Sequence, residues 1–97
     1  MMVLITYDVN TTDKRGLKRL RNVSKQCTNF GQRVQNSVFE CSLTPAQLSD
    51  LKNKLISIID LENDSIRFYN LGKNWQNRVE TIGKDESYDP DQDLLII

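Results

Sequence analysis

Apolar positions recur along the chain in two rhythms, and the change of rhythm predicts where strands and helices lie. Residues 3–7 (VLITY) are apolar at nearly every position, which is typical of a central strand covered on both faces. A polar turn at residues 10–13 offers capping side chains, and apolar residues then recur at helical spacing from Leu17 to Cys27. Gly31 ends this pattern, so we expect an amphipathic helix between the turn and the glycine.

The middle of the chain predicts two further strands and a second helix. Residues 33–35 (RVQ) and 37–43 (SVFECSL) are short β-rich segments whose proximity indicates a tight hairpin or a bulged strand. Residues 44–47 (TPAQ) form a capping box with proline at the first helical position. Leucines and isoleucines follow at helical spacing over residues 48–59, so a helix is expected to begin at the capping box.

The remaining apolar patterns complete the predicted order of elements. Residues 65–71 (SIRFYNL) alternate like a half-buried strand, and residues 78–82 (RVETI) are a weaker strand candidate. The order β-α-β-β-α-β, with extra strand material at the end, fits an α+β sandwich of the ferredoxin-like type. Such a sandwich has two helices on one face of an antiparallel sheet. We therefore expect one ferredoxin-like domain over residues 1–83.

Residues 84–97 form an acidic linker followed by an apolar end. They hold one lysine against five acidic residues, and they finish in four apolar residues, Leu94–Ile97, at a terminus that would normally fray. An open edge of the sheet could accept them as an additional C-terminal strand. We expect this strand to be exchanged between the subunits of a symmetric dimer. The alternative is that the tail folds back on its own sheet.

Charge is unevenly distributed, although the formal net charge is zero. The first 33 residues hold seven basic side chains and two acidic ones. On the expected helix, the basic side chains form a stripe away from the apolar face, flanked by two arginines. We call this stripe the basic ridge: Lys14, Lys18, Arg21 and Lys25, with Arg15 and Arg19 at its flanks. The ridge suits a nucleic-acid phosphate backbone, whereas the simpler interpretation is a solvated helix face.

Asp8 ends the first apolar strand, and two roles are open to it. It could cap the following turn or helix, which is a common task for an aspartate in a loop. It could also bind Mg²⁺, which is typically held by one or two protein carboxylates, if two-fold symmetry brought two copies to one cleft. The chain has no histidine, so hydrolysis would depend on a metal-activated water. Asp8 would then hold the metal against a phosphate presented by the basic helix.

Composition narrows the class of protein. With 38% hydrophobic and 27% charged residues, and no apolar stretch of about 18 residues, the chain is expected to be soluble, cytoplasmic and without a membrane partner. Cys27 and Cys41 lack a metal-binding spacing and are expected to be buried free thiols. Tyr7, Phe39 and Trp75 could stack on bases or belong to the core. The aromatic strand signature of an RNA-recognition module is absent from the sequence.

Three segments together resemble a known family. "LITYDV" near the start, "GQRVQNSVFEC" in the middle and "SIRFYNLG" after the second expected helix look like the small nuclease subunit of CRISPR adaptation systems, the partner of the spacer integrase. The resemblance covers almost the whole chain. It implies a ferredoxin-like fold, a symmetric homodimer and Mg²⁺-dependent endonuclease activity on RNA or duplex DNA. It also implies a structural role in spacer acquisition beside the integrase subunit.

The resemblance assigns site residues by position. Asp8 matches the family's metal-binding aspartate and Tyr7 its neighbour, whereas Arg33, Ser37 and Phe39 match the middle motif. The two flanking arginines match only in being basic residues early in the first helix. The catalytic residues expected are Asp8, Tyr7 and Ser37, with Asp8 as the metal ligand. The residues expected to bind nucleic acid are Lys14, Arg15, Lys18, Arg19, Arg21, Lys25, Arg33 and Phe39.

The function expected from the sequence is therefore a dimeric, metal-dependent endonuclease of the CRISPR adaptation machinery. The competing hypothesis is a non-catalytic dimeric scaffold that positions DNA for the integrase. In that case Asp8 would be a turn residue, and the arginines would carry the function.

Overall fold

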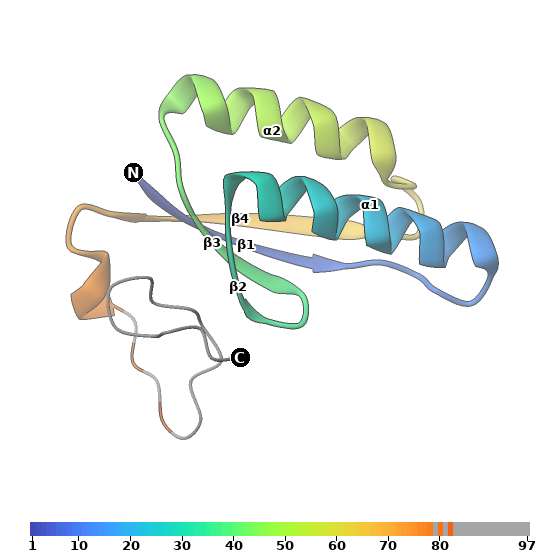
Figure 1. The fold of residues 1–97 in the computed structure, drawn as a ribbon, viewed down its shortest axis with the longest axis horizontal. Coiled ribbons are helices and arrows are strands. Elements are labelled where there is room, and N and C mark those ends of the chain that lie inside the picture. The colour runs from blue at the N-terminus through green and yellow to red at the C-terminus, as the bar shows by residue number, and fades with distance from the viewer. Residues whose placement is uncertain (79, 81, 83–97) are drawn as a thin grey trace.

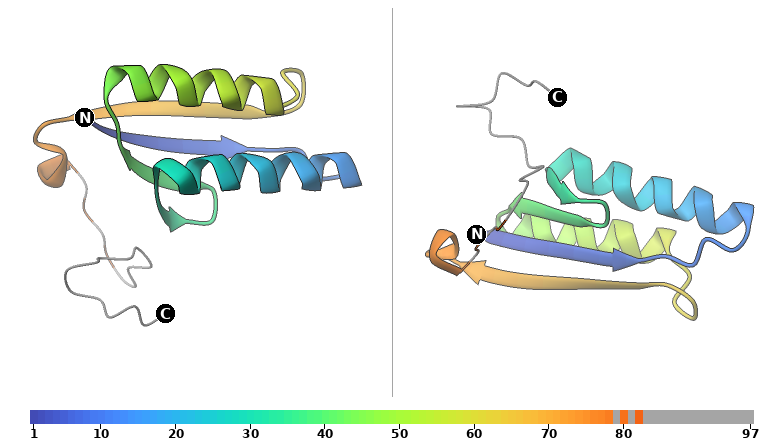
Figure 2. Two further views of the ribbon diagram at one scale, coloured as in Figure 1. Left: turned by 45° about the horizontal axis from the view of Figure 1, so that its top comes forward. Right: turned by 90° about the horizontal axis from the view of Figure 1, so that it is seen from below.

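The computed structural model describes residues 1–78, 80 and 82, which form one antiparallel sheet and two long helices. The elements in chain order are β1 (Met2–Asp8), α1 (Lys14–Phe30), β2 (Gly31–Gln35), β3 (Val38–Ser42), α2 (Pro45–Ile58), β4 (Ser65–Gly72) and the 3-10 helix η1 (Trp75–Arg78). The strands are ordered β2-β3-β1-β4, and both helices cover the same face of the sheet (Figures 1 and 2). The ferredoxin-like α+β arrangement expected from the sequence is confirmed.

The core lies between the helices and one face of the sheet. Side chains alternate along a strand, so every second residue of β1 and β3 faces the helices. Each large apolar side chain that is fully buried there contributes about 1.5–3 kcal/mol relative to leaving it in water. The side chains with less than 2% exposure are Val3, Ile5, Val23, Cys27, Phe39, Cys41, Leu51 and Leu55. Both cysteines are free thiols, as expected, and burial raises the pKa of Cys27 to about 12 and that of Cys41 to about 11.

Neither α1 nor α2 covers the opposite face of the sheet, and we call it the open face (Figure 2). On β1, the intervening residues Leu4, Thr6 and Asp8 belong to this face, because Val3, Ile5 and Tyr7 are buried on the other one. On β4, Arg67 and Tyr69 belong to it, because the alternate residues on that strand pack against the core. Asp8 and Tyr7 are thus adjacent in sequence but point to opposite sides of the sheet.

Both helices begin at side-chain caps that the sequence indicated. The carboxylate of Asp13 accepts a hydrogen bond from the Gly16 N–H at 2.9 Å at the start of α1. At the start of α2, the Thr44 hydroxyl accepts from the Gln47 N–H at 3.1 Å, and the Gln47 side chain accepts from the Thr44 N–H at 2.9 Å. The expected capping box is therefore present.

One residue expected on the apolar face of α1 is instead exposed. Leu17 is 45% exposed, whereas Val23 and Cys27 further along the helix are buried. The first turns of α1 extend beyond the end of β1, so the sheet does not reach under this leucine (Figure 1).

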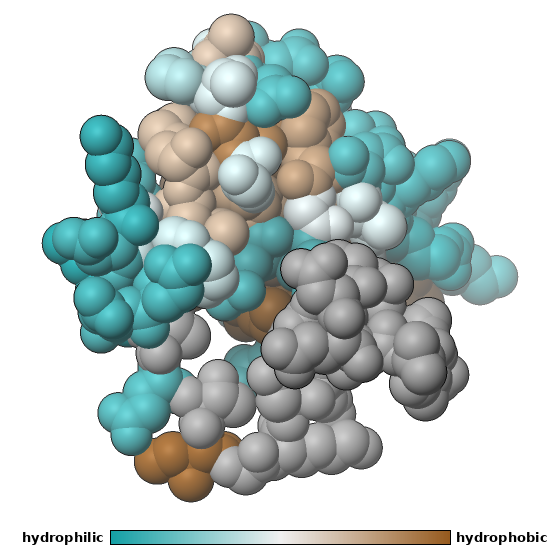
Figure 3. Space-filling model, turned by 60° about the vertical axis from the view of Figure 1, so that its left-hand side comes forward, coloured by the Kyte–Doolittle hydropathy of each residue, from teal (hydrophilic) through white to brown (hydrophobic). Residues whose placement is uncertain are grey.

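On the side of the molecule shown in Figure 3, apolar surface gathers at the upper centre between hydrophilic regions. No helix among the described residues is long and apolar enough to cross a membrane.

The prediction of a strand over residues 78–82 is wrong at the positions of this range that the structure describes. Arg78 ends the 3-10 helix η1, and residues 80 and 82 belong to no regular element. The Arg78 guanidinium donates a hydrogen bond to the Leu71 carbonyl at 2.9 Å, which turns the chain back toward the end of β4 instead of extending it. Residues 79, 81 and 83–97 lie outside the described residues, and with them the additional C-terminal strand and its exchange.

Candidate functional site

Asp8 lies at the end of β1 with an exposed carboxylate. Its side chain makes no hydrogen bond or ion pair with any residue in the described part of the chain. The capping work in the following loop is done by other residues: Asp13 caps α1, and the Asn10 side chain accepts from the Thr12 N–H at 3.0 Å. The capping role considered for Asp8 is therefore filled elsewhere, and its carboxylate is available to a ligand.

The loop that follows Asp8 is fixed by a buried carboxylate that the sequence did not single out. The side chain of Asp64 is 0% exposed, and it accepts hydrogen bonds from the Asn10 N–H and the Asp60 N–H, each at 2.9 Å. The Arg19 Nε donates to it at 2.8 Å. Burial alone would raise the pKa of Asp64, but the Arg19 and backbone hydrogen bonds outweigh it, and the pKa is lowered. We call this set of contacts the Asp64 anchor.

Two other contacts hold the same loop. Arg19 Nη2 donates a hydrogen bond to the Asn10 carbonyl at 3.4 Å. Both backbone polar groups of Asn10 are therefore hydrogen-bonded, the N–H to Asp64 and the carbonyl to Arg19. Gly16 lies so close to the loop that a Cβ atom at this position would be 1.9 Å from the Asn10 carbonyl oxygen. Arg19 was expected to bind nucleic acid, and the structure gives its guanidinium a partner inside the protein. Its contact with nucleic acid stays a prediction.

The basic ridge is exposed along α1. None of its four side chains forms an ion pair with another residue in the described part of the chain, and the flanking Arg15 is likewise exposed and unpaired there. Unpaired cations on one helix face attract polyanions, because no acidic neighbour neutralises them. The ridge lies on α1, so it belongs to the helix-covered side of the sheet, whereas Asp8 belongs to the open face. The expectation that the helix presents a phosphate directly to Asp8 of the same chain does not fit this arrangement.

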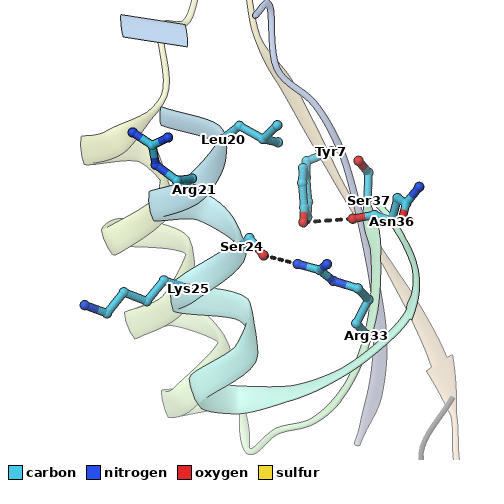
Figure 4. A pocket seen from close by; sticks show the side chains of 8 residues that line it. All are labelled: Tyr7, Leu20, Arg21, Ser24, Lys25, Arg33, Asn36 and Ser37. Atoms are coloured by element: carbon cyan, nitrogen blue, oxygen red, sulfur yellow. Dashed lines mark hydrogen bonds between the residues drawn. The ribbon is translucent and has the colours of Figure 1, made fainter. Parts of the chain in front are cut away.

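Tyr7 and Ser37 meet in a pocket of about 560 Å³ between α1 and the sheet (Figure 4). The Tyr7 N–H donates to the Ser37 carbonyl at 3.1 Å, and the Tyr7 hydroxyl donates to the Asn36 carbonyl at 3.4 Å. Burial raises the pKa of Tyr7 above its usual 10.0, so the phenol stays protonated at neutral pH. Asp8 does not line this pocket, whose lining residues are Tyr7, Leu20, Arg21, Ser24, Lys25, Arg33, Asn36 and Ser37.

Arg33 is the cation that points into this pocket. Figure 4 shows its guanidinium directed toward Ser24 and Tyr7, whereas Arg21 and Lys25 extend away from the cavity. Arg33 donates a hydrogen bond to the Ser24 hydroxyl, and its guanidinium lies 5.4 Å from the centre of the Phe39 ring.

The prediction that Phe39 binds nucleic acid is wrong. Its ring is 0% exposed and packs 6.1 Å from the ring of Tyr7, so no base can reach its face. Phe39 instead belongs to the core, and the Arg33 guanidinium packs over its ring.

The comparison with known families decides which protein family carries this site. A family model described as "CRISPR associated protein Cas2" matches residues 1–79. The chain belongs to the Cas2 family. The resemblance carried by the three sequence segments is thereby confirmed, and the matched range includes Asp8, the Asp64 anchor, the basic ridge and the pocket.

Individual Cas2 proteins match over nearly the whole chain. The "CRISPR-associated endoribonuclease Cas2" of Nitratidesulfovibrio vulgaris is 51% identical over 96 residues, which cover 99% of this chain and 94% of that relative. The "CRISPR-associated endonuclease Cas2" of Halalkalibacterium halodurans is 55% identical over 95 residues, which cover 98% and 99%. The crystal structure of Streptococcus pyogenes Cas2 at pH 6.5 matches with a TM-score of 0.78 and 67% identity, covering 86% of this chain and 100% of that one.

In the part of this Cas2 chain that the structure describes, a metal site would have to be built from few protein ligands. Among the described residues, no group of three or more histidine, cysteine, aspartate or glutamate side chains is arranged to hold a metal. One exposed, unpaired carboxylate per chain still fits Mg²⁺, because this ion keeps most of its water and commonly takes only one or two carboxylates.

Proposed function

We propose that this chain is a cytoplasmic, Mg²⁺-dependent endonuclease that hydrolyses phosphodiester bonds of RNA or double-stranded DNA during CRISPR spacer acquisition. The observation that carries the proposal is the free carboxylate of Asp8 at the end of a central strand. A strand end held by neighbouring strands is a rigid support for a metal ligand. The relatives named endoribonuclease and endonuclease support the same activity.

The proposed site needs two copies of the chain. We infer a homodimer in which two-fold symmetry brings the Asp8 carboxylates of both subunits to one cleft, since the described residues of a single chain place no second unpaired carboxylate beside Asp8. Mg²⁺ bound between them would supply an activated water and stabilise the charge that develops on the phosphate. Asp8 would hold the ion, and the Asp64 anchor keeps the backbone on its C-terminal side in place.

The proposed roles of Tyr7 and Ser37 are indirect. Their side chains line the pocket on the helix-covered side, so neither is placed to touch a phosphate bound at Asp8 of the same chain. Tyr7 remains protonated and therefore cannot act as a general base at neutral pH. We infer that both residues fix the end of β1, through the hydrogen bond between the Tyr7 N–H and the Ser37 carbonyl.

A second candidate function is a non-catalytic scaffold that holds duplex DNA for the integrase subunit. The separation of the basic ridge from Asp8 favours it, because α1 could bind a phosphate backbone without any contribution from the open face. Under this alternative the ridge and Arg33 carry the function, and removal of Asp8 leaves it intact.

An Asp8→Ala variant of the full-length chain discriminates between the two. Its cutting of matched RNA and duplex DNA in Mg²⁺ should fall by at least about 100-fold, which corresponds to about 2.7 kcal/mol of transition-state stabilisation, while binding is retained. Asp50→Ala, which removes an exposed carboxylate from α2, is the matched control and should cut normally. Undiminished cutting by a rigorously pure Asp8→Ala sample would contradict the assignment. Binding without cutting by the unmodified chain would support the scaffold.

A further inference from the structure

The open face of the sheet carries a cation beside Asp8 that the sequence analysis did not single out. Arg67 is exposed in the middle of β4, and its neighbours Ile66 and Phe68 pack against the core. Because side chains alternate along a strand, Arg67 lies on the same face as Asp8, away from the helices.

The strand register makes these two residues neighbours. In the ladder between β1 and β4, Thr6 pairs with Arg67 and Asp8 pairs with Ser65. Asp8 and Arg67 are therefore diagonal neighbours on one face, a relationship that separates residues by about 7–8 Å and lies within reach of long side chains. That spacing leaves room for a phosphate group between a metal held by the carboxylate and the guanidinium.

The two charges do not neutralise each other. Neither Asp8 nor Arg67 forms an ion pair with any residue in the described part of the chain. The guanidinium of Arg67 is instead oriented along β4 by a 3.4 Å hydrogen bond to the Tyr69 hydroxyl. Tyr69 is 43% exposed on the same face, so its ring is accessible beside the arginine.

We propose that Arg67 is a substrate-binding residue of the Asp8 site. Its guanidinium holds a phosphate of the strand that is cut, and Tyr69 positions that guanidinium. This role of Arg67 rests on the proposed nuclease function. Unlike the cations of the basic ridge, Arg67 lies on the face of the sheet that carries Asp8. Arginine suits this task because its fixed fork of N–H donors matches phosphate oxygens.

The test measures binding in an Asp8→Asn background, in which the proposed metal ligand is removed and the strand stays uncut. Binding of a fluorescently labelled single-stranded RNA is measured by anisotropy over a series of salt concentrations. Adding Arg67→Ala should weaken binding about tenfold and lower the slope of log affinity against log salt by about 0.7. Arg67→Lys should keep most of the slope, because it retains the charge. Tyr69→Phe, which loses only the hydroxyl, should weaken binding less than Arg67→Ala.

Lys73 provides the matched control. It is also exposed, and it follows Gly72, which pairs with Met2 at the opposite end of β1 from Asp8. Lys73→Ala should leave affinity and slope unchanged. If Arg67→Ala behaves like Lys73→Ala, the role of Arg67 is overturned while the nuclease proposal stands. If Asp8→Asn alone still cuts in Mg²⁺, the nuclease site itself is misassigned, and the role of Arg67 at that site fails with it.

Discussion

Replacing Asp64 by asparagine should destabilise the protein far more than removing any exposed carboxylate. Asparagine has nearly the same shape, but its amide keeps only one acceptor oxygen and places an NH₂ donor where the second carboxylate oxygen was. The groups that face this side chain are all donors. At least one of the Asp60 and Asn10 N–H groups loses its acceptor, and the Arg19 guanidinium loses its counter-charge. The anchor that holds the loop after Asp8 is then broken.

The loss of unfolding free energy expected for Asp64→Asn follows from these contacts. Hydrogen bonds to a charged group contribute about 1.5–3 kcal/mol each, and a buried donor left without an acceptor costs about 1–3 kcal/mol. Arg19 is partly exposed, so water replaces some of its lost interaction, and we discount that contribution. The expected loss is about 2–4 kcal/mol. For a domain of this size, such a loss lowers the Tm by about 10–25 °C.

Thermal unfolding followed by circular dichroism measures the effect, with Asp50→Asn as the matched control. Asp50 forms a 3.3 Å ion pair with Lys54 in which both side chains are about half exposed, so its loss should change the Tm little. The folded-state pKa of Asp64 lies below its ordinary value of 3.8, so the stability this carboxylate provides is complete above about pH 4 and declines as the pH falls further. Unmodified protein and Asp64→Asn should therefore converge in acid. Equal Tm values for Asp64→Asn and Asp50→Asn at pH 7 would refute the reasoning.

Two further predictions concern the loop and the helix beside it. Gly16→Ala should lower the free energy of unfolding by at least about 1–3 kcal/mol, because the new Cβ would lie 1.9 Å from the Asn10 carbonyl oxygen. Asn22→Ala, at an exposed position of the same helix, should not destabilise, and a Gly16→Ala protein as stable as this control would argue against the close approach. Replacing all four basic-ridge residues by alanine should lower the salt slope for duplex DNA binding by about 3–4 units, at about 0.9 per phosphate contact. Replacing Lys52 and Lys54 of α2 by alanine should leave that slope unchanged. If the ridge variant and this control show the same slope, the ridge is a solvated helix face.

The order of elements could be predicted from the sequence because each has a local signature. The capping box at Thr44 and the alternation over residues 65–71 depend only on neighbouring residues, and the structure has both. Leu17 shows where local patterns fail: periodicity indicates which stripe of a helix is apolar, but not how far the helix extends past the sheet. The strand prediction that began at Arg78 fails for a similar reason, since the hydrogen bond of this residue to Leu71 depends on where β4 ends.

The candidate site was predictable in part. Asp8 could be found because it follows an apolar strand, and the alternation of residues 65–71 already placed Arg67 among the polar positions of its strand. Asp64 could not be found, because its partners Asn10 and Arg19 lie 54 and 45 positions away in the sequence. Phe39 was misassigned because a motif match does not distinguish a buried ring from an exposed one.

The opposite orientation of Tyr7 and Asp8 limits how this chain can change in length. Inserting or deleting one residue within β1 would shift its register by one and exchange the two faces. The carboxylate would then be driven toward the core and the phenol toward solvent, so a single codon's gain or loss would damage packing and the proposed metal site together. A two-residue change would restore the faces but would displace the strand end from the Asp64 anchor. Length changes that keep both the packing and the proposed metal site are therefore expected only outside β1 and its following loop. The turn between β2 and β3 is constrained as well, because the Asn36 and Ser37 carbonyls accept hydrogen bonds from Tyr7.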